Sequence, residues 1–164
     1  MPAPYTGMRR KIEDCVANYI RSTYDLPTDW NLYRSMDVIE GDGVKAPCVL
    51  VVCPGTTPFS GDSLGPNCGI SNRVATINVV IKTPAQDKKD GDIVTETCSE
   101  RHERVVGSIL DTFYRTDIVD ALNAMAEPGI GVDQFDYPEE TMNPEKGIYV
   151  TTLAMTITIH PTGD

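Results

Sequence analysis

The segment at residues 149–160 carries the strongest strand pattern in the chain, because apolar and polar side chains alternate along it. The apolar members are Tyr149, Leu153, Met155, Ile157 and Ile159, and the polar members are Thr152, Thr156, Thr158 and His160. A period of two places these sets on opposite faces of a strand. We therefore expect a sheet that buries one face of this segment.

Three further stretches have strand character. Residues 73–82 alternate in the same way, so that one face would lie in the core and the other would be mixed. Residues 47–53 begin with a proline and continue with consecutive apolar side chains, which predicts a strand covered on both faces. Residues 130–137 are the expected partner of the C-terminal strand, across a turn.

An amphipathic helix is predicted near the N-terminus. Its apolar stripe recurs at helical spacing from Met8 to Ile20, and the pattern stops before Pro27. Glu13 and Asp14 fall outside this stripe. We therefore expect both carboxylates on the polar face.

A second amphipathic helix has a visible start. Thr97 and Glu100 form an S/T-x-x-E capping box, which satisfies backbone N–H groups that the helix leaves without partners. A shorter helix follows at residues 118–126, and Asp117 is its expected N-cap.

This order of elements predicts an α+β fold, with a mostly antiparallel β-sheet and two main α-helices packed on one face. A length of 164 residues fits a single domain over 1–164. Two connections, about residues 54–72 and 83–95, lack periodicity and are long for a compact domain. Loops of this length are usually functional, so both are candidate contact segments.

The net charge of −10 restricts the classes of partner. An acidic surface repels phosphate, so nonspecific binding of nucleic acid is not expected, although DNA could slide past such a surface. The longest apolar run, residues 49–53, is too short to cross a membrane, and the chain starts without a secretion signal. We therefore expect a cytoplasmic chain whose five cysteines are reduced.

Residues 61–65 read Gly-Asp-Ser-Leu-Gly, which matches the G-x-S-x-G motif and the signature of GDSL esterases. That motif needs a helix directly after the serine, and Gly65 and Pro66 interrupt one here. A flexible turn explains the sequence better. A small GDSL-like serine hydrolase using Ser63 is kept as a remote alternative.

Cys98 and His102 lie four residues apart on the second helix, which is a spacing that two metal ligands use. No third ligand accompanies them in the sequence, so a core histidine and a buried, inert thiol are the favoured interpretation. The sequence also lacks a glycine-rich phosphate-binding motif. We therefore predict no catalytic residue, no metal and no cofactor.

The order of these segments resembles the tail terminator, or tail-completion, proteins in the neck of tailed bacteriophages. The resembling pieces are residues 8–24, 73–82, 97–114 with the run His102-Glu103-Arg104-Val105-Val106, and 148–159. Proteins of that family form a sixfold ring that caps the tail tube, and they have no active site. The resemblance implies a structural virion protein that is not an enzyme.

The resemblance also implies the partners. They are copies of the same chain, the tail tube protein and a head-completion or connector protein, with DNA passing through the lumen unbound and assembly in the host cytoplasm. Another head–tail connector or adaptor of the neck is the alternative. A ring needs heterologous contacts, and the candidate interface residues on the two loops are Phe59, Asp62, Leu64, Asp87, Lys88, Lys89 and Asp90.

Overall fold

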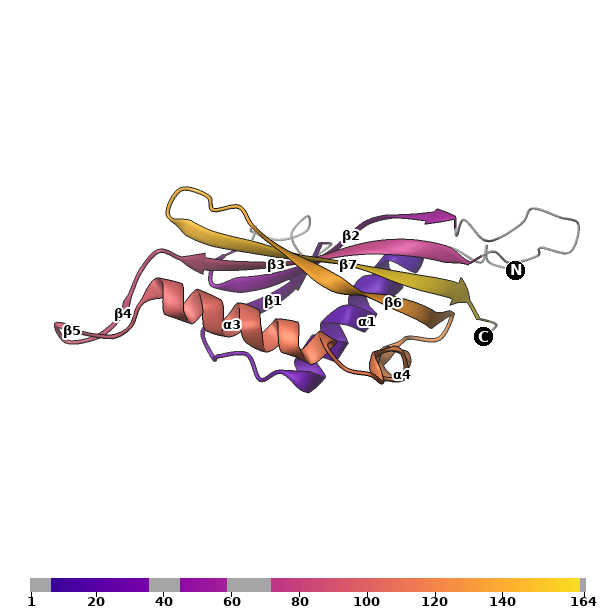
Figure 1. Ribbon diagram of the computed structural model, residues 1–164, viewed down its shortest axis with the longest axis horizontal. Coiled ribbons are helices and arrows are strands. Elements are labelled where there is room, and N and C mark those ends of the chain that lie inside the picture. Colours follow the sequence, from indigo (N-terminus) through magenta and orange to yellow (C-terminus); the bar gives the residue numbers. More distant parts are fainter. Residues whose placement is uncertain (1–6, 36–44, 59–71, 163–164) are drawn as a thin grey trace, which may run out of the picture.

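The computed structural model describes residues 7–35, 45–58 and 72–162. These residues form helices, a five-stranded sheet and a separate two-stranded sheet (Figure 1). The elements are α1 (Met8–Thr23), β1 (Asn31–Arg34), β2 (Cys48–Pro58), β3 (Arg73–Pro84), β4 (Lys88–Asp90), β5 (Ile93–Glu96), α3 (Cys98–Phe113), α4 (Ile118–Met125), β6 (Ile130–Met142) and β7 (Ile148–Pro161). The predicted α+β class is confirmed.

The large sheet has the strand order β1-β2-β3-β7-β6. β1 runs parallel to β2, and every other neighbouring pair is antiparallel. β7 pairs with β3 along the whole length of β3, from Arg73 opposite Ile159 to Pro84 opposite Ile148. The two segments with the clearest alternation in the sequence therefore lie side by side in the middle of the sheet.

The helices cover one face of this sheet. On that face the side chains of Val51, Ile77 and Leu153 are fully buried, in one core with the stripes of α1 and α3. On the other face Leu50 and Val52 are only half-buried. The prediction that the strand at 47–53 is covered on both faces was therefore wrong, because the described helices all pack on the same side.

α1 buries more than its apolar stripe. Ile12 and Ile20 are buried as expected, but Glu13 and Asp14 are only 2% and 6% exposed. The reason is that β1 and β2 pack beside the helix and bring hydrogen-bond donors to both carboxylates. The polar face predicted for these two residues was wrong.

The two predicted N-caps have different outcomes. Thr97 caps α3, because its hydroxyl accepts a hydrogen bond of 3.2 Å from the backbone N–H of Glu100. Asp117 precedes α4, but its carboxylate accepts two hydrogen bonds from the Arg115 guanidinium, at 2.9 and 2.7 Å, and none from the helix. A charge-assisted bidentate pair is stronger than a single cap bond, which explains the choice.

β2 continues past the point where the sequence predicted its end. Its pairing with β3 shifts between Val52 and Gly55, so that a bulge contains Pro54, and the strand then runs to Pro58. Proline is tolerated at a bulge because it has no N–H to donate. The predicted loop at 54–72 is therefore strand over 54–58, while residues 59–71 lie outside the described part of the chain.

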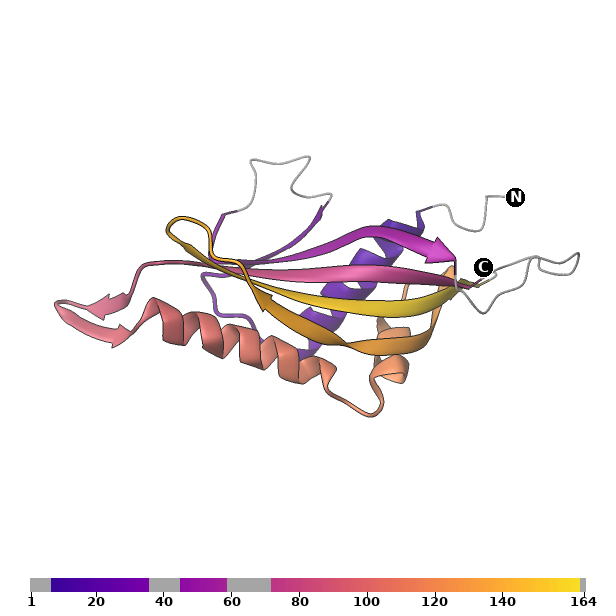
Figure 2. The same ribbon diagram turned by 45° about the horizontal axis from the view of Figure 1, so that its top comes forward.

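The predicted loop at 83–95 is also wrong in most of its length. β3 extends through Pro84, and residues 88–96 form the β4–β5 hairpin. Figures 1 and 2 show this hairpin projecting beyond the N-terminal end of α3, away from the rest of the molecule. The segment is exposed, as expected, but it is ordered by strand pairing.

β6 is the expected partner of β7, and it extends five residues beyond 137, to Met142. Its pairing shifts twice, between Val132 and Gln134 and between Asp136 and Glu139. At the first shift the Asn123 side chain of α4 donates to the carbonyl of Val132 and accepts from its N–H, both at 2.8 Å. α4 therefore binds the outer strand of the sheet, β6, at this bulge.

Candidate subunit interface

The β4–β5 hairpin, residues 88–96, is the most prominent projection of the described chain, and we call it the arm. Asp90 pairs with Ile93 on either side of a two-residue turn in which Gly91 has a φ of 64°. Glycine adopts this conformation without strain, and glycine at the first position of a two-residue turn is typical of tight hairpins. Beyond the turn, Ile93 and Val94 expose 71% and 44% of their surface.

The base of the arm is fixed to α3. Asp87 accepts a hydrogen bond of 2.8 Å from the backbone N–H of Cys98, and this bond lowers the pKa of the Asp87 carboxyl. Glu96 accepts two hydrogen bonds from Arg104, at 2.9 and 3.1 Å, which hold the pKa of Glu96 below its usual value. A two-stranded hairpin alone is marginal in water, so these bonds are what hold the arm in place.

A chain of aromatic rings leads from the core to the surface at the other end of α3. The order is Tyr19, Phe113, Phe135, Tyr137 and Tyr114, with ring centroids 5.2, 5.9, 5.6 and 5.0 Å apart in turn. These separations are typical of favourable aromatic pairs. The innermost rings are fully buried, whereas Tyr114 and Tyr137 are 54% and 48% exposed.

Tyr114 and Tyr137, which we call the aromatic patch, are held rigidly. Their rings stack with an interplanar angle of 6°. The Tyr137 hydroxyl donates to the backbone carbonyl of Arg115 at 3.1 Å, and Arg115 is bound in turn by Asp117. A rigid aromatic pair loses little conformational entropy on binding, which is why tyrosine is common at protein interfaces.

The sequence-predicted interface residues fall into two groups. Asp87 lies at the base of the arm, and Lys88, Lys89 and Asp90 form β4, where all are exposed. Phe59, Asp62 and Leu64 lie outside the residues that the structure describes, and so does Ser63 of the Gly-Asp-Ser-Leu-Gly motif. The structure therefore places the four charged interface candidates together on and beside the arm, whereas the candidates of the 59–71 segment lie outside the described residues.

Four exposed side chains were missed by the sequence interpretation: Ile93, Val94, Tyr114 and Tyr137. Gly91-Asp92 followed by β-branched residues is a hairpin signal that could have identified Ile93 and Val94. The stacking of Tyr114 on Tyr137 joins residues 23 positions apart in the sequence. No local pattern indicates that contact.

His102 is a core residue, as the favoured interpretation had it. Its side chain is fully buried, and its two ring nitrogens lie 2.8 Å from the Thr83 hydroxyl and 2.7 Å from the Thr151 hydroxyl. Its ring also packs against Tyr149, with centroids 5.6 Å apart. Within residues 7–35, 45–58 and 72–162, no group of three or more potential metal ligands includes His102 and Cys98.

The stability of the protein should depend on pH through His102. Burial is the main cause of its lowered pKa, since the charged ring would lose its hydration, and the nearby Glu103 carboxylate opposes the shift only in part. The unfolded state therefore binds a proton below about pH 6.5 while the folded state resists it. We expect the unfolding free energy to fall as the pH drops below this value.

Urea denaturation at several pH values tests this expectation. His102→Gln can keep both threonine contacts without a titratable ring, so its stability should change less than that of the wild type between about pH 5 and pH 7. His160→Gln removes the other histidine, which lies on the surface 2.9 Å from Asp133, and is the matched control for the loss of a histidine. Equal pH dependence in the wild type and His102→Gln would contradict the assignment.

A cavity of about 470 Å³ lies at the N-terminal end of α1. Its lining includes Arg9, Arg10 and Arg73. Arg9 donates to the backbone carbonyl of Cys53 at 2.7 Å, and Arg73 donates to the Thr56 hydroxyl at 2.8 Å. These two guanidinium groups hold the irregular part of β2, so the basic lining has a structural role.

The buried thiols are poor nucleophiles. Burial raises the pKa of Cys15 to about 12, and the pKa values of Cys48 and Cys53 to about 11. A thiol with such a pKa is almost wholly protonated near neutral pH. Cys98, for which a buried and inert thiol was expected, is only half-buried at the start of α3, so that prediction was wrong in its burial.

No helix in the described ranges has the length and apolarity that a membrane crossing requires. No family model and no curated protein matches the chain.

Proposed function

We propose that the protein is a structural virion protein that forms a ring at the end of a phage tail tube and joins the tube to the head-completion proteins of the neck. The observation that carries this proposal is the arm, which projects from the body and presents Ile93 and Val94 to solvent. Apolar side chains on such a projection are available for another molecule to cover. Exposed apolar patches rimmed by polar residues often mark interaction sites.

Charge is consistent with the same role. The chain carries 24 acidic and 14 basic residues, which gives a net charge of −10. An acidic wall repels the phosphates of DNA, so a ring of such chains could let DNA pass without holding it. The sixfold symmetry and the identity of the tube and connector partners come from the resemblance alone.

The test is assembly in solution. We expect the purified protein to form closed rings, measured by sedimentation velocity and negative-stain imaging, and to add to the ends of tail tubes. The double variant Ile93→Asp/Val94→Asp should lose the rings, because it places two charges on the apolar tip. Its unfolding free energy should stay within about 1 kcal/mol of the wild type, since both positions are exposed.

Met142→Asp is the matched control. Met142 is 45% exposed at the end of β6, outside the arm, and receives the same kind of charge. This variant should still assemble. A wild-type protein that stays monomeric at high concentration and does not bind tail tubes would rule out the proposed function.

A further inference from the structure

We infer that the arm of one subunit docks onto the aromatic patch of a second copy of the same chain. This inference rests on the proposed function, because it names the contact that would close the ring. The two surfaces hold four of the five large hydrophobic side chains that are exposed in the described residues. Each surface is small: the arm carries one of these apolar side chains on each face, and the patch consists of two stacked rings.

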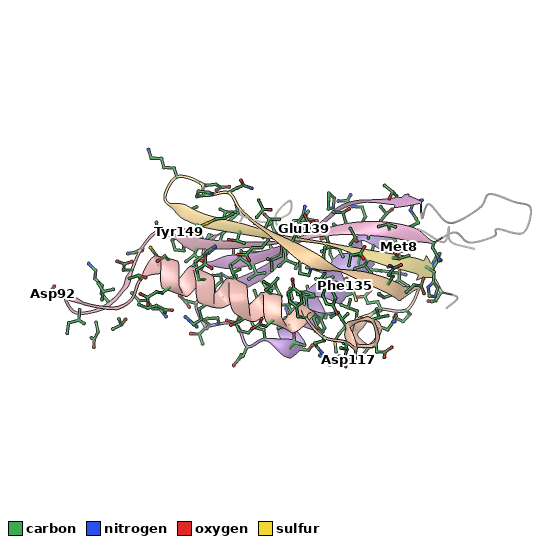
Figure 3. The ribbon with its side chains drawn as sticks, viewed as in Figure 1. Met8, Asp92, Asp117, Phe135, Glu139 and Tyr149 are labelled. Atoms are coloured by element: carbon green, nitrogen blue, oxygen red, sulfur yellow. The ribbon has the colours of Figure 1, made fainter. Side chains whose placement is uncertain are left out.

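The positions of the two surfaces dictate the kind of contact. The arm leaves the N-terminal end of α3, and Tyr114 follows its C-terminal end. α3 has 16 residues, which corresponds to a length of about 24 Å. Figure 3 shows Asp92 at the tip of the arm and Asp117 and Phe135 toward the other end of the helix. An arm fixed at its base cannot reach the patch of its own chain.

A contact between an arm and the patch of a neighbour is heterologous, since different surfaces of the two subunits meet. Contacts of this type continue from subunit to subunit and give closed rings or open filaments instead of twofold dimers. The structure therefore supplies both halves of a repeating contact on one chain. A ring needs both halves of the contact on one chain, whereas the binding of an unrelated partner needs only one of them.

Charges around the two surfaces are complementary. On the arm, Lys88 and Lys89 are exposed, and in the patch the exposed carboxylates of Asp136 and Glu139 flank Tyr137. Complementary charges of this kind guide two surfaces into register more than they add affinity.

The size of the contact decides its role. Ile93 and Val94 are consecutive in β5 and point to opposite faces of the arm, so one face of the arm against two tyrosine rings buries far less than the roughly 800 Å² per partner of a standard interface. The arm contact is therefore the anchor of a larger interface. Rigid aromatic side chains often contribute most of the binding energy at such anchors.

Two variants with complementary defects test the docking. One is Ile93→Asp/Val94→Asp, in which the arm is defective and the patch is intact. The other is Tyr114→Asp, in which the patch is defective and the arm is intact. Each variant alone should stay monomeric, because every possible contact then uses one defective surface.

An equimolar mixture should give a dimer and nothing larger. The intact arm of the Tyr114→Asp chain can bind the intact patch of the other variant, and the two surfaces that remain are both defective. Sedimentation at high concentration should therefore show a species of twice the chain mass of 18.0 kDa. Circular dichroism and thermal melting check the fold, and Tyr114→Ala replaces Tyr114→Asp if the latter unfolds.

The outcomes separate the two proposals. Rings of the wild type together with no dimer in the mixture would overturn the docking and leave the ring standing. Rings formed by both single-defect variants would do the same. A wild type that never assembles, with or without tail tubes, would remove the proposed function itself.

Discussion

Replacing Phe113 with alanine should destabilise the protein by about 3–5 kcal/mol, which is the usual cost of deleting a buried phenylalanine. Phe113 is fully buried at the C-terminal end of α3. Its ring lies between those of Tyr19 and Phe135, with centroids 5.2 and 5.9 Å away. Removal of the ring leaves a cavity that three rigid elements cannot close. This loss is a large fraction of the 5–15 kcal/mol that typically stabilises a domain.

Urea denaturation followed by circular dichroism measures this loss. Phe113→Leu fills much of the same space and should cost clearly less. Ile93→Ala changes a side chain that is 71% exposed and should fall within about 0.5 kcal/mol of the wild type. A loss below about 1 kcal/mol for Phe113→Ala would show that Phe113 does not fill the junction between α3 and β6.

Phe113→Ala should also weaken ring assembly, but by less than a substitution in the aromatic patch itself. Phe135 packs between Phe113 and Tyr137, so the inner ring supports the exposed one through a single intermediate. A variant that stays folded at low temperature should still place Tyr114 on the surface but hold it less rigidly. Core stability and interface geometry are thus coupled through the aromatic chain.

Periodicity in the sequence was enough to predict the regular part of the fold. Alternation identified β3 and β7, and helical spacing together with the Thr97 cap identified α1 and the start of α3. These signals are local, because each reflects a repeating exposure of one face of one element. The burial of Ile77 and Leu153 follows from them directly.

What the sequence could not predict depends on contacts between distant segments. β2 was expected to stop before Pro54, since proline usually interrupts a strand, and only the bulge allows it to continue. The aromatic patch joins the end of α3 to β6, and no spacing along the chain indicates that Tyr114 and Tyr137 meet. The charged residues of the arm were recognised, whereas the apolar tip that gives the arm its proposed use was not.

The polar groups of the β2 bulge provide the second large expected effect. The pairing shift between Val52 and Gly55 leaves Cys53 in the irregular part of the strand. Glu13 of α1 accepts a hydrogen bond of 3.0 Å from the Cys53 N–H, and Arg9, one turn earlier on α1, donates to the Cys53 carbonyl at 2.7 Å. Glu13 also accepts from the backbone N–H of Ser35, at 3.0 Å, at the end of β1.

Replacing Glu13 with alanine should therefore cost about 2–5 kcal/mol, because it leaves the buried N–H of Cys53 and the N–H of Ser35 without acceptors, at roughly 1–3 kcal/mol for each such group. Glu13→Gln keeps one carbonyl oxygen and should lose less. Glu103→Ala, the same kind of change at an exposed helix position, should stay within about 0.5 kcal/mol.

Hydrogen exchange distinguishes this cause from a general loss of packing. In Glu13→Ala the Cys53 amide should exchange much faster than in the wild type. The amides of Val79 and Leu153 in the central strands should exchange faster only by the factor that the lost unfolding free energy predicts. If the Cys53 amide kept its protection, Glu13 would not be its acceptor, and the bulge would have to be held by β3 alone. The expected pattern would show instead that a buried carboxylate on α1 is what allows β2 to pass Pro54 and continue along the sheet.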